Sequence, residues 1–184
     1  CAGCCRGSSI GPETLRRAIT TLRCELTQFY GTSETYIITL LRPAQHDPGD
    51  AELLTSCGAP VPLVDIQVVD ADGGPVPDGE IGEVLVRSPM MFNGYWNLPV
   101  ATAAVLAEGW YHTGDLGRLD DRGLLHLVDR LKDMIVTGGE NVYSVEVERA
   151  LATHPDVASA PSSALPTNAG ANASSPTSWP AREP

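Results

Sequence analysis

Three polar segments of this sequence carry residue types that can do chemistry when a turn exposes them. Residues 30–35 read Tyr-Gly-Thr-Ser-Glu-Thr, and residues 110–115 read Trp-Tyr-His-Thr-Gly-Asp. Residues 129–142 contain Arg130, the only lysine of the sequence, Lys132, and a glycine pair. Carboxylates can hold a divalent cation, and hydroxyl and cationic groups can hydrogen-bond an anion. Each segment alone is more typical of an ordinary loop, so the argument depends on all three.

Composition excludes several other classes of function. The 184 residues carry a formal net charge of −11, which does not suit a surface that neutralises nucleic-acid phosphates. The longest strongly apolar stretch, residues 36–41, is far too short to cross a bilayer. Five cysteines without a second Cys pair or a His pair at ligand spacing predict neither a metal site nor a disulfide framework.

Periodicity predicts the elements that must position the three segments. Apolar residues at helical spacing predict a helix over residues 12–26, followed by a β-prone run at 26–30 and a turn at 31–35. Strands are expected at 64–69 and 82–87, and a hairpin at 117–127 with its turn at 120–123. This β-rich middle is typical of a small barrel or meander.

The pattern changes after residue 128. A short strand is expected at 134–136, ending at a glycine pair, and Ser144 is expected to cap a helix that ends near residues 154–155. Residues 157–184 are dominated by Ala, Ser and Pro without apolar periodicity, so we expect this tail to be disordered.

Taken together and in this order, the three segments, with Gly94-Tyr-Trp between the first two, resemble the later core motifs of the adenylate-forming superfamily. That superfamily contains acyl-CoA synthetases, the adenylation domains of peptide synthetases and firefly luciferase. The run over residues 143–148 is most similar to fatty-acid and related acyl-CoA ligases.

The resemblance covers residues 8–160 and implies a mixed α/β fold. Residues 1–129 would form the later part of the large AMP-binding N-terminal domain, including its β-barrel-like subdomain. Residues 130–156 would form the hinge and the start of the small α+β C-terminal domain.

The resemblance also implies a nucleotide site. Tyr30 would stack on adenine, Ser33 would hydrogen-bond the α-phosphate of ATP, and Glu34 would hold Mg²⁺. Asp115 would accept both ribose hydroxyls, and Arg130 would approach the ribose and the phosphate. The implied nucleotide-binding residues are Tyr30, Gly31, Thr32, Ser33, Asp115 and Arg130, of which Ser33 and Arg130, with Glu34, would be catalytic.

The remaining implied residues serve the acid and the thiol. Lys132 would be the hinge about which the small domain rotates, and Gly138 and Gly139 would line the tunnel for the CoA pantetheine. The carboxylate end of the acyl pocket would be bordered by Phe29, Gly31, Cys57 and Gly58. Residues 37–41 fit an apolar pocket wall and ordinary core equally well.

Two motifs of the superfamily have no counterpart in this sequence: the phosphate loop ending in Pro-Lys-Gly and the distal adenylation lysine. We therefore expect an incomplete and inactive fragment of a cytoplasmic, fatty-acid-activating acyl-CoA synthetase that uses ATP, Mg²⁺ and CoA. The alternatives are a ligase for an aromatic or other acid, and a non-catalytic nucleotide-binding or scaffold remnant.

The tail suggests why the distal lysine is missing. Residues 165–176, back-translated with GC-rich codons and read in another frame, give Ala-His-Glu-Arg-Trp-Gly-Glu-Arg-Val-Val-Ala, a sequence typical of acyl-CoA ligases soon after this point. The tail is therefore interpreted as a frameshifted version of the C-terminal domain.

Overall fold

The computed structural model describes residues 2–5, 11–23, 25–137, 140–144, 147, 150–151, 154, 157–159, 162–166, 172–176 and 179–180. The chain forms two compact units, and each is described here by itself. Unit 1 comprises Cys1–Thr113 and Gly117–Leu127, and unit 2 comprises Gly114–Leu116 and Val128–Pro184. The predicted boundary between the large domain and the hinge, at residues 129–130, stays a prediction.

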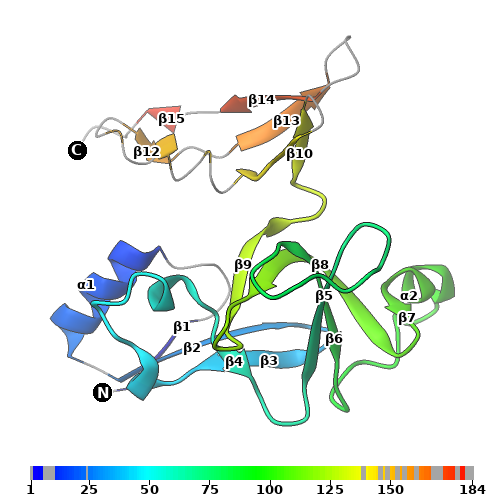
Figure 1. The fold of residues 1–184 in the computed structure, drawn as a ribbon, viewed down its shortest axis with the longest axis horizontal. Helices are drawn as coiled ribbons and strands as arrows, with labels where there is room; N and C mark the ends of the chain where they lie inside the picture. The colour runs from blue at the N-terminus through cyan, green and yellow to red at the C-terminus, as the bar shows by residue number, and fades with distance from the viewer. Residues whose placement is uncertain are drawn as a thin grey trace. The chain divides into compact units, whose positions relative to one another are not determined.

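A four-stranded sheet forms the first half of unit 1 (Figure 1). Strand β1 pairs in parallel with β2, and the pairs β2–β3 and β3–β4 are antiparallel. The strands, in sheet order, are β1 (Ala2–Cys5), β2 (Glu25–Thr32), β3 (Tyr36–Leu41) and β4 (Ala59–Pro60). Two short 3-10 turns, η1 (Pro43–Gln45) and η2 (Leu53–Thr55), lie between β3 and β4 in the chain.

Helix α1 (Pro12–Leu22) buries Leu15 in a cluster with Leu26 and Leu54. The predicted helix over residues 12–26 is wrong at its end, because Arg23 adopts a left-handed conformation with φ 48° and ψ 40°. That conformation ends the helix, and β2 starts at Glu25.

A five-stranded sheet forms the second half of the β-rich region, with the order β5–β6–β8–β7 and β9 also pairing with β8. Its strands are β5 (Asp65–Val69), β6 (Gly82–Arg87), β7 (Leu106–Ala107), β8 (Trp110–Leu119) and β9 (Leu125–Arg130). The strands predicted at 64–69 and 82–87 are confirmed. Helix α2 (Pro99–Val105) was not predicted; it begins with proline at its first position, where the missing N–H costs nothing.

The predicted loop at residues 110–115 is wrong, because all six residues lie inside β8. The turn of the first segment is also shorter than expected, since Gly31 and Thr32 belong to β2 and only residues 33–35 form the turn. A β-bulge between Tyr30 and Gly31 precedes this turn. A Cβ at Gly31 would lie 1.8 Å from the Tyr36 carbonyl oxygen, so the bulge requires glycine.

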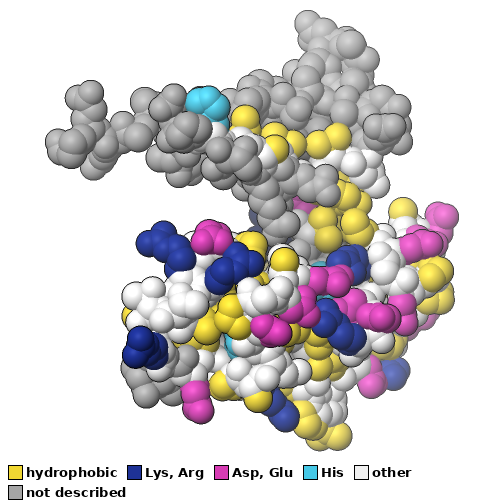
Figure 2. Space-filling view, turned by 60° about the vertical axis from the view of Figure 1, so that its left-hand side comes forward, with side chains coloured by type: hydrophobic (Ala, Val, Ile, Leu, Met, Phe, Trp, Pro, Cys, Tyr) yellow, Lys and Arg dark blue, Asp and Glu magenta, His cyan; other side chains and the backbone are white. Residues whose placement is uncertain are grey.

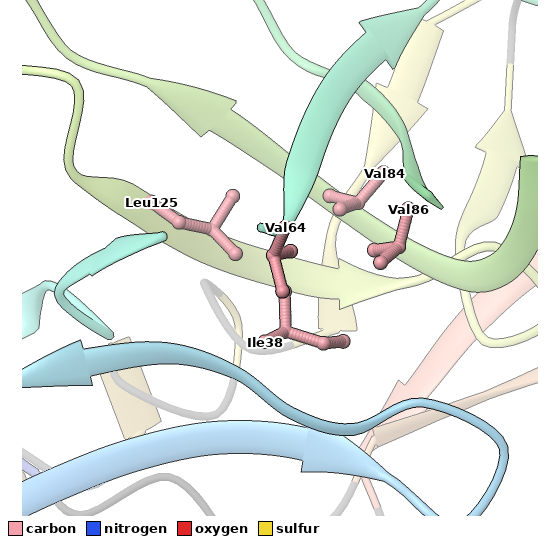
Figure 3. Packing of buried hydrophobic residues seen from close by; sticks show 5 residues of the cluster. All are labelled: Ile38, Val64, Val84, Val86 and Leu125. Carbon is pink, nitrogen blue, oxygen red and sulfur yellow. The ribbon is translucent and has the colours of Figure 1, made fainter. Parts of the chain in front are cut away.

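The main core of unit 1 joins the two sheets (Figure 3). Ile38 of β3 packs with Val84 and Val86 of β6, with Val64 before β5 and with Leu125 of β9. Ile38 and Leu41 are fully buried. Residues 37–41 were expected to form either an apolar pocket wall or ordinary core, and these two side chains belong to the core.

The predicted turn between β8 and β9 is confirmed, since the Gly123 N–H donates to the Asp120 carbonyl at 2.9 Å. The Asp120 carboxylate is buried and accepts hydrogen bonds from the Leu124 and Arg122 N–H groups and from His126. Burial alone would raise the pKa of Asp120, but these donors together hold it below its ordinary value.

We expect Asp120→Asn to lower the free energy of unfolding by about 3 kcal/mol at pH 7, because it removes a buried carboxylate that accepts hydrogen bonds from the Leu124 and Arg122 N–H groups and faces His126. A lowered pKa stabilises the fold above the ordinary aspartate value of about 3.9, and the effect is lost as the pH falls through the folded value. The difference between wild type and Asp120→Asn should therefore shrink at pH 3. Urea unfolding at pH 7 and pH 3 measures this difference, and Asp121→Asn, at an exposed aspartate, is the control. An equal loss of unfolding free energy at the two pH values would contradict the account.

Unit 2 contains the antiparallel pair β10 (Ile135–Thr137) and β11 (Glu140–Val142), one residue later than the strand predicted at 134–136. Ser144 is itself helical, as are the described residues Val147, Ala150 and Leu151, so the predicted cap is wrong. Instead, the Ser144 N–H and hydroxyl both donate to Asp129 Oδ2, at 2.5 and 2.8 Å.

The tail differs from the predicted disorder at the positions that the structure describes. β12 (Val157–Ser159) pairs with β15 (Trp179–Pro180), and β13 (Ser162–Pro166) pairs with β14 (Asn172–Pro176). The prediction of disorder was based on the missing apolar periodicity. Strand pairing uses backbone groups and does not need such periodicity.

Candidate active site

Glu34 occupies the tight turn between β2 and β3, where its backbone and side chain are both held. Its carbonyl oxygen accepts a hydrogen bond from the Phe92 N–H at 2.7 Å. Its carboxylate Oε1 accepts a hydrogen bond from the Tyr95 hydroxyl at 2.8 Å. The side chain is therefore oriented by a segment about sixty residues later in the chain.

Aromatic rings surround this contact. The Phe92 ring meets Tyr95 edge-on at 4.9 Å between centroids and Tyr111 at 5.8 Å. The Tyr95 N–H donates to Thr102 Oγ1 of α2 at 2.9 Å. A Cβ at Gly94 would lie 2.7 Å from Thr102 Cγ2, and Gly94 has φ +132°, so glycine permits this approach.

The surroundings of Glu34 favour its ionised form. Burial works against ionisation, but hydrogen bonds from Tyr95, from the Glu34 N–H, from Thr32 and from Tyr111 hold the pKa of Glu34 below its usual value. Burial and the nearby Glu34 charge raise the pKa of Tyr111, which stays protonated. Magnesium is commonly bound by one or two carboxylates together with substrate phosphates. A single ionised, oriented carboxylate fits that role.

Tyr95→Phe should raise the pKa of Glu34 toward its ordinary value, because the lost hydroxyl stabilises only the carboxylate form. Carboxyl ¹³C chemical shifts of glutamate-labelled protein followed against pH would measure the change. Tyr36→Phe, at an exposed tyrosine of β3, is the control. An unchanged Glu34 titration in Tyr95→Phe would show that the hydroxyl does not set the carboxylate's protonation.

The other residues of this segment lie around the turn in different settings. The Thr32 and Thr35 hydroxyl oxygens are 2.9 Å apart, and Thr35 is fully buried, so the Thr32 hydroxyl helps to close the turn. Ser33 is exposed at its tip. Tyr30 is half-buried and packs against the main core cluster, and half-buried Phe29 lies opposite Leu40 in the sheet.

Cys57 and Gly58 lie in a segment bound to two strands. The Cys57 N–H donates to the Leu125 carbonyl at 2.7 Å, and the Thr39 hydroxyl donates to the Cys57 carbonyl at 2.7 Å. Gly58 has φ +93°, and a Cβ there would lie 2.1 Å from the Leu40 carbonyl carbon. The Cys57 side chain is half-buried.

Asp115 and Arg130, which the resemblance assigns to the same ribose, lie close together in unit 2. Arg130 Nε is 3.5 Å from Asp115 Oδ1; the Asp115 side chain is 14% exposed and that of Arg130 63%. The Leu131 N–H donates to the Gly114 carbonyl at 2.8 Å, which fixes the two chain segments side by side. Lys132 follows in an exposed turn, whereas Gly138 and Gly139 fall outside the described residues.

The sequence over residues 2–96, more than half of the chain, matches the family described as AMP-binding enzyme. The chain belongs to this family. The predicted resemblance to adenylate-forming enzymes is thereby confirmed.

Individual members of the AMP-binding family agree with this assignment. A medium/long-chain-fatty-acid–CoA ligase of Mycobacterium tuberculosis is 46% identical over 152 residues, which are 82% of this chain and 26% of that protein. The solved amide bond synthetase of Marinactinospora thermotolerans is 42% identical with a TM-score of 0.82, over 94% of this chain and 34% of that structure.

A third similar protein was solved with a reaction intermediate. The o-succinylbenzoate CoA synthetase of Bacillus subtilis, in complex with its acyl-adenylate, is 33% identical with a TM-score of 0.82, over 94% of this chain and 35% of that structure. The chain thus spans about a quarter to a third of the length of these AMP-binding enzymes. Among the described residues, no helix is long and apolar enough to cross a membrane.

Within this candidate site, sequence reasoning missed Tyr95. The Gly94-Tyr-Trp run served only as a landmark between two segments. The position of Tyr95 directly after a glycine in this run was the one signal in the sequence that could have indicated it. Its contact with Glu34 could not be predicted, because the two residues are far apart in the chain.

Proposed function

We propose that this chain is part of an AMP-forming ligase that activates a carboxylic acid and transfers it to CoA. In the first step a carboxylate oxygen attacks the α-phosphorus of ATP, a P–O bond forms, and the bond to pyrophosphate breaks. In the second step the CoA sulfur attacks the acyl carbon and AMP leaves. The observation that supports this most directly is the ionised Glu34 carboxylate, oriented by Tyr95 at a turn that also exposes Ser33.

The residues of the chain would bind and orient ATP in the first step. Tyr30 would stack on the adenine, with Gly31 and Thr32 beside it, and the Ser33 hydroxyl would donate to the α-phosphate. Asp115 would accept the ribose hydroxyls, and Arg130, already 3.5 Å from Asp115, would bring positive charge to the phosphate. Positioning and charge neutralisation account for most catalysis of phosphate-centred displacement.

Glu34 would hold Mg²⁺. Bound there with the ATP phosphates, Mg²⁺ would neutralise charge on the departing pyrophosphate. The Tyr95 hydroxyl would keep the Glu34 carboxylate in one orientation for that purpose.

The second step would use the segment after β9. Lys132 would act as the hinge for a rotation of the small domain, and Gly138 and Gly139 would line the path of the CoA pantetheine. An exposed residue in a turn can change its backbone angles without losing packing. Phe29, Gly31, Cys57 and Gly58 would border the acid.

We infer that the acid is a fatty acid. Similarity to the mycobacterial fatty-acid–CoA ligase supports this choice. An aromatic acid is the second candidate, supported by the similarity to o-succinylbenzoate CoA synthetase. A cytoplasmic location is part of the proposal, because ATP and CoA are available there.

The test is ATP–pyrophosphate exchange by a longer protein, in which this chain is extended upstream to include the phosphate loop and its reading frame is restored after about residue 157. The acids offered are octanoic, hexadecanoic, ferulic and o-succinylbenzoic acid. We expect exchange to be fastest with a fatty acid and to need Mg²⁺. Fastest exchange with an aromatic acid would overturn the fatty-acid assignment. No exchange with any acid would favour a non-catalytic nucleotide-binding or scaffold remnant.

The 184-residue chain assayed alone is expected to show no exchange, because Lys132 is its only lysine and is assigned to the hinge. Activity of the chain alone would contradict this. Sequencing the coding DNA tests the frameshifted tail: another frame over residues 165–176 should encode a Glu-Arg-Trp-Gly-like stretch, and its absence would refute the idea.

A further inference from the structure

A buried histidine lies between the β8–β9 turn and the segment that precedes β4. His126 of β9 is 4% exposed, and its Nε2 lies 3.1 Å from Oδ2 of Asp120, which is 5% exposed. On its other side, His126 Nδ1 lies 3.3 Å from the Thr55 hydroxyl oxygen. Both ring nitrogens of a buried imidazole thus have a polar neighbour in unit 1.

The direction of these hydrogen bonds follows from the neighbours. The Thr55 hydroxyl donates its single hydrogen to the Glu52 carbonyl at 2.7 Å, so toward His126 it can only accept. An ionised carboxylate is also only an acceptor, and the pKa of Asp120 is held below its ordinary value. Both acceptors would be satisfied together if His126 donated from both nitrogens, which only the protonated ring can do.

The charges nearby balance such a cation. Arg122 lies 3.0 Å from Asp50 and 3.4 Å from Asp120, and Arg118 lies 3.1 Å from Glu52. Three carboxylates thus face two arginines, and a protonated His126 supplies the third positive charge. The face of the molecule in Figure 2 likewise shows acidic side chains gathered beside basic ones.

The same donor atoms do not suit a metal ion. One ligand atom each of Glu52, Asp120 and His126 lie within 4.8 Å of one another. However, both carboxylates already accept from arginines, and a metal ligand needs a free lone pair on the imidazole. A ring that donates from both nitrogens leaves no such lone pair.

The chain next to Thr55 is the segment assigned to the acid. The Cys57 N–H donates to the Leu125 carbonyl, and the Leu125 N–H donates to the Gly58 carbonyl at 3.0 Å. The Ser56 hydroxyl also lies 3.4 Å from the Leu125 carbonyl. Residues 55–58 are thus bound to β9 by the backbone on one side of His126 and by the imidazole through Thr55.

We propose that His126, as a doubly protonated imidazolium bridging Asp120 and Thr55, is a positioning residue that fixes residues 55–58 and thereby tunes the affinity for the carboxylic acid. This assignment to the acid rests on the proposed function. The protonation state does not, since it follows from hydrogen bonds within unit 1. The two parts can therefore be tested separately.

The protonation state is tested by a long-range ¹H–¹⁵N spectrum of the histidine side chains in the 184-residue chain at pH 7. We expect His126 to carry a proton on both nitrogens, and Thr55→Val to weaken the Nδ1 proton signal. Adding Zn²⁺ should leave these signals unchanged. One bare ring nitrogen, or displacement of the protons by Zn²⁺, would overturn the proposal.

The positioning role is tested by exchange kinetics of the longer protein. His126→Gln and Thr55→Val should each raise the KM for the acid about tenfold, the loss expected for a hydrogen bond to a charged group. The KM for ATP should stay within about twofold, and Thr55→Ser, which keeps the hydroxyl, should restore most of the acid affinity. Equal changes for acid and ATP, or none for either, would overturn the role. A wild type without exchange would contradict the proposed function itself, while the spectrum still decides the protonation state.

Discussion

Glu34→Ala should lower the rate of Mg²⁺-dependent adenylation in the longer protein by about 100- to 1,000-fold, the usual cost of removing one group that stabilises transition-state charge. The carboxylate is ionised and oriented by the Tyr95 hydroxyl, so under the proposed function its loss would remove a prepared metal ligand. Pyrophosphate exchange at increasing Mg²⁺ measures the effect. Part of the loss should be recovered at high Mg²⁺, because phosphates and water can supply other ligands.

Glu80→Ala is the matched control, because Glu80 is an exposed glutamate of the same unit. It should leave both the rate and its Mg²⁺ dependence unchanged. If Glu34→Ala adenylates at the wild-type rate, Glu34 is not the metal ligand, and its contact with Tyr95 is purely structural.

Lys132→Pro should separate the two half-reactions. Proline fixes φ and removes the backbone N–H, and it also restricts Leu131 before it. A hinge locked in this way should slow transfer to CoA by about 100-fold or more while adenylation stays within about threefold. Single-turnover kinetics of each half-reaction measures both values.

Two comparisons decide whether the backbone of Lys132 is responsible. Lys132→Ala keeps the backbone freedom and should leave transfer to CoA far less affected than Lys132→Pro. Asp115→Ala should instead slow both half-reactions, because AMP stays bound throughout the cycle. Equal losses in both steps for Lys132→Pro would show that Lys132 is not the pivot.

Local patterns predicted the elements of unit 1 better than their ends. The strands at residues 64–69 and 82–87 follow from their apolar runs, and the turn at 120–123 follows from its Asp and Gly residues. The end of α1 was wrong because a left-handed Arg23 is decided by tertiary context and not by helical periodicity. Residues 110–115 form a strand because they pair within a sheet, and the loop prediction gave too little weight to the β-prone Trp110, Tyr111 and Thr113.

In the candidate site, local features were predicted but contacts between distant parts of the chain were not. The polar pattern predicted a turn at Glu34, and the resemblance implied that Asp115 and Arg130 both approach the ribose. The structure has Glu34 in a turn and Asp115 within 3.5 Å of Arg130. The Tyr95 hydroxyl bond to Glu34 and the His126 contacts with Thr55 and Asp120 join distant parts of the chain. Such contacts depend on the packing of two sheets, so they could not be predicted from spacing.

The most direct measurement for the account is to identify the product of a single turnover of the longer protein with ATP, Mg²⁺ and a fatty acid, without CoA. Mass spectrometry should find an acyl-adenylate and pyrophosphate in equal amounts, and added CoA should convert the adenylate into a thioester and AMP. Formation of ADP with an acyl phosphate, or of no acyl product with any acid that is tried, would contradict the assignment of this chain to an AMP-forming acid ligase.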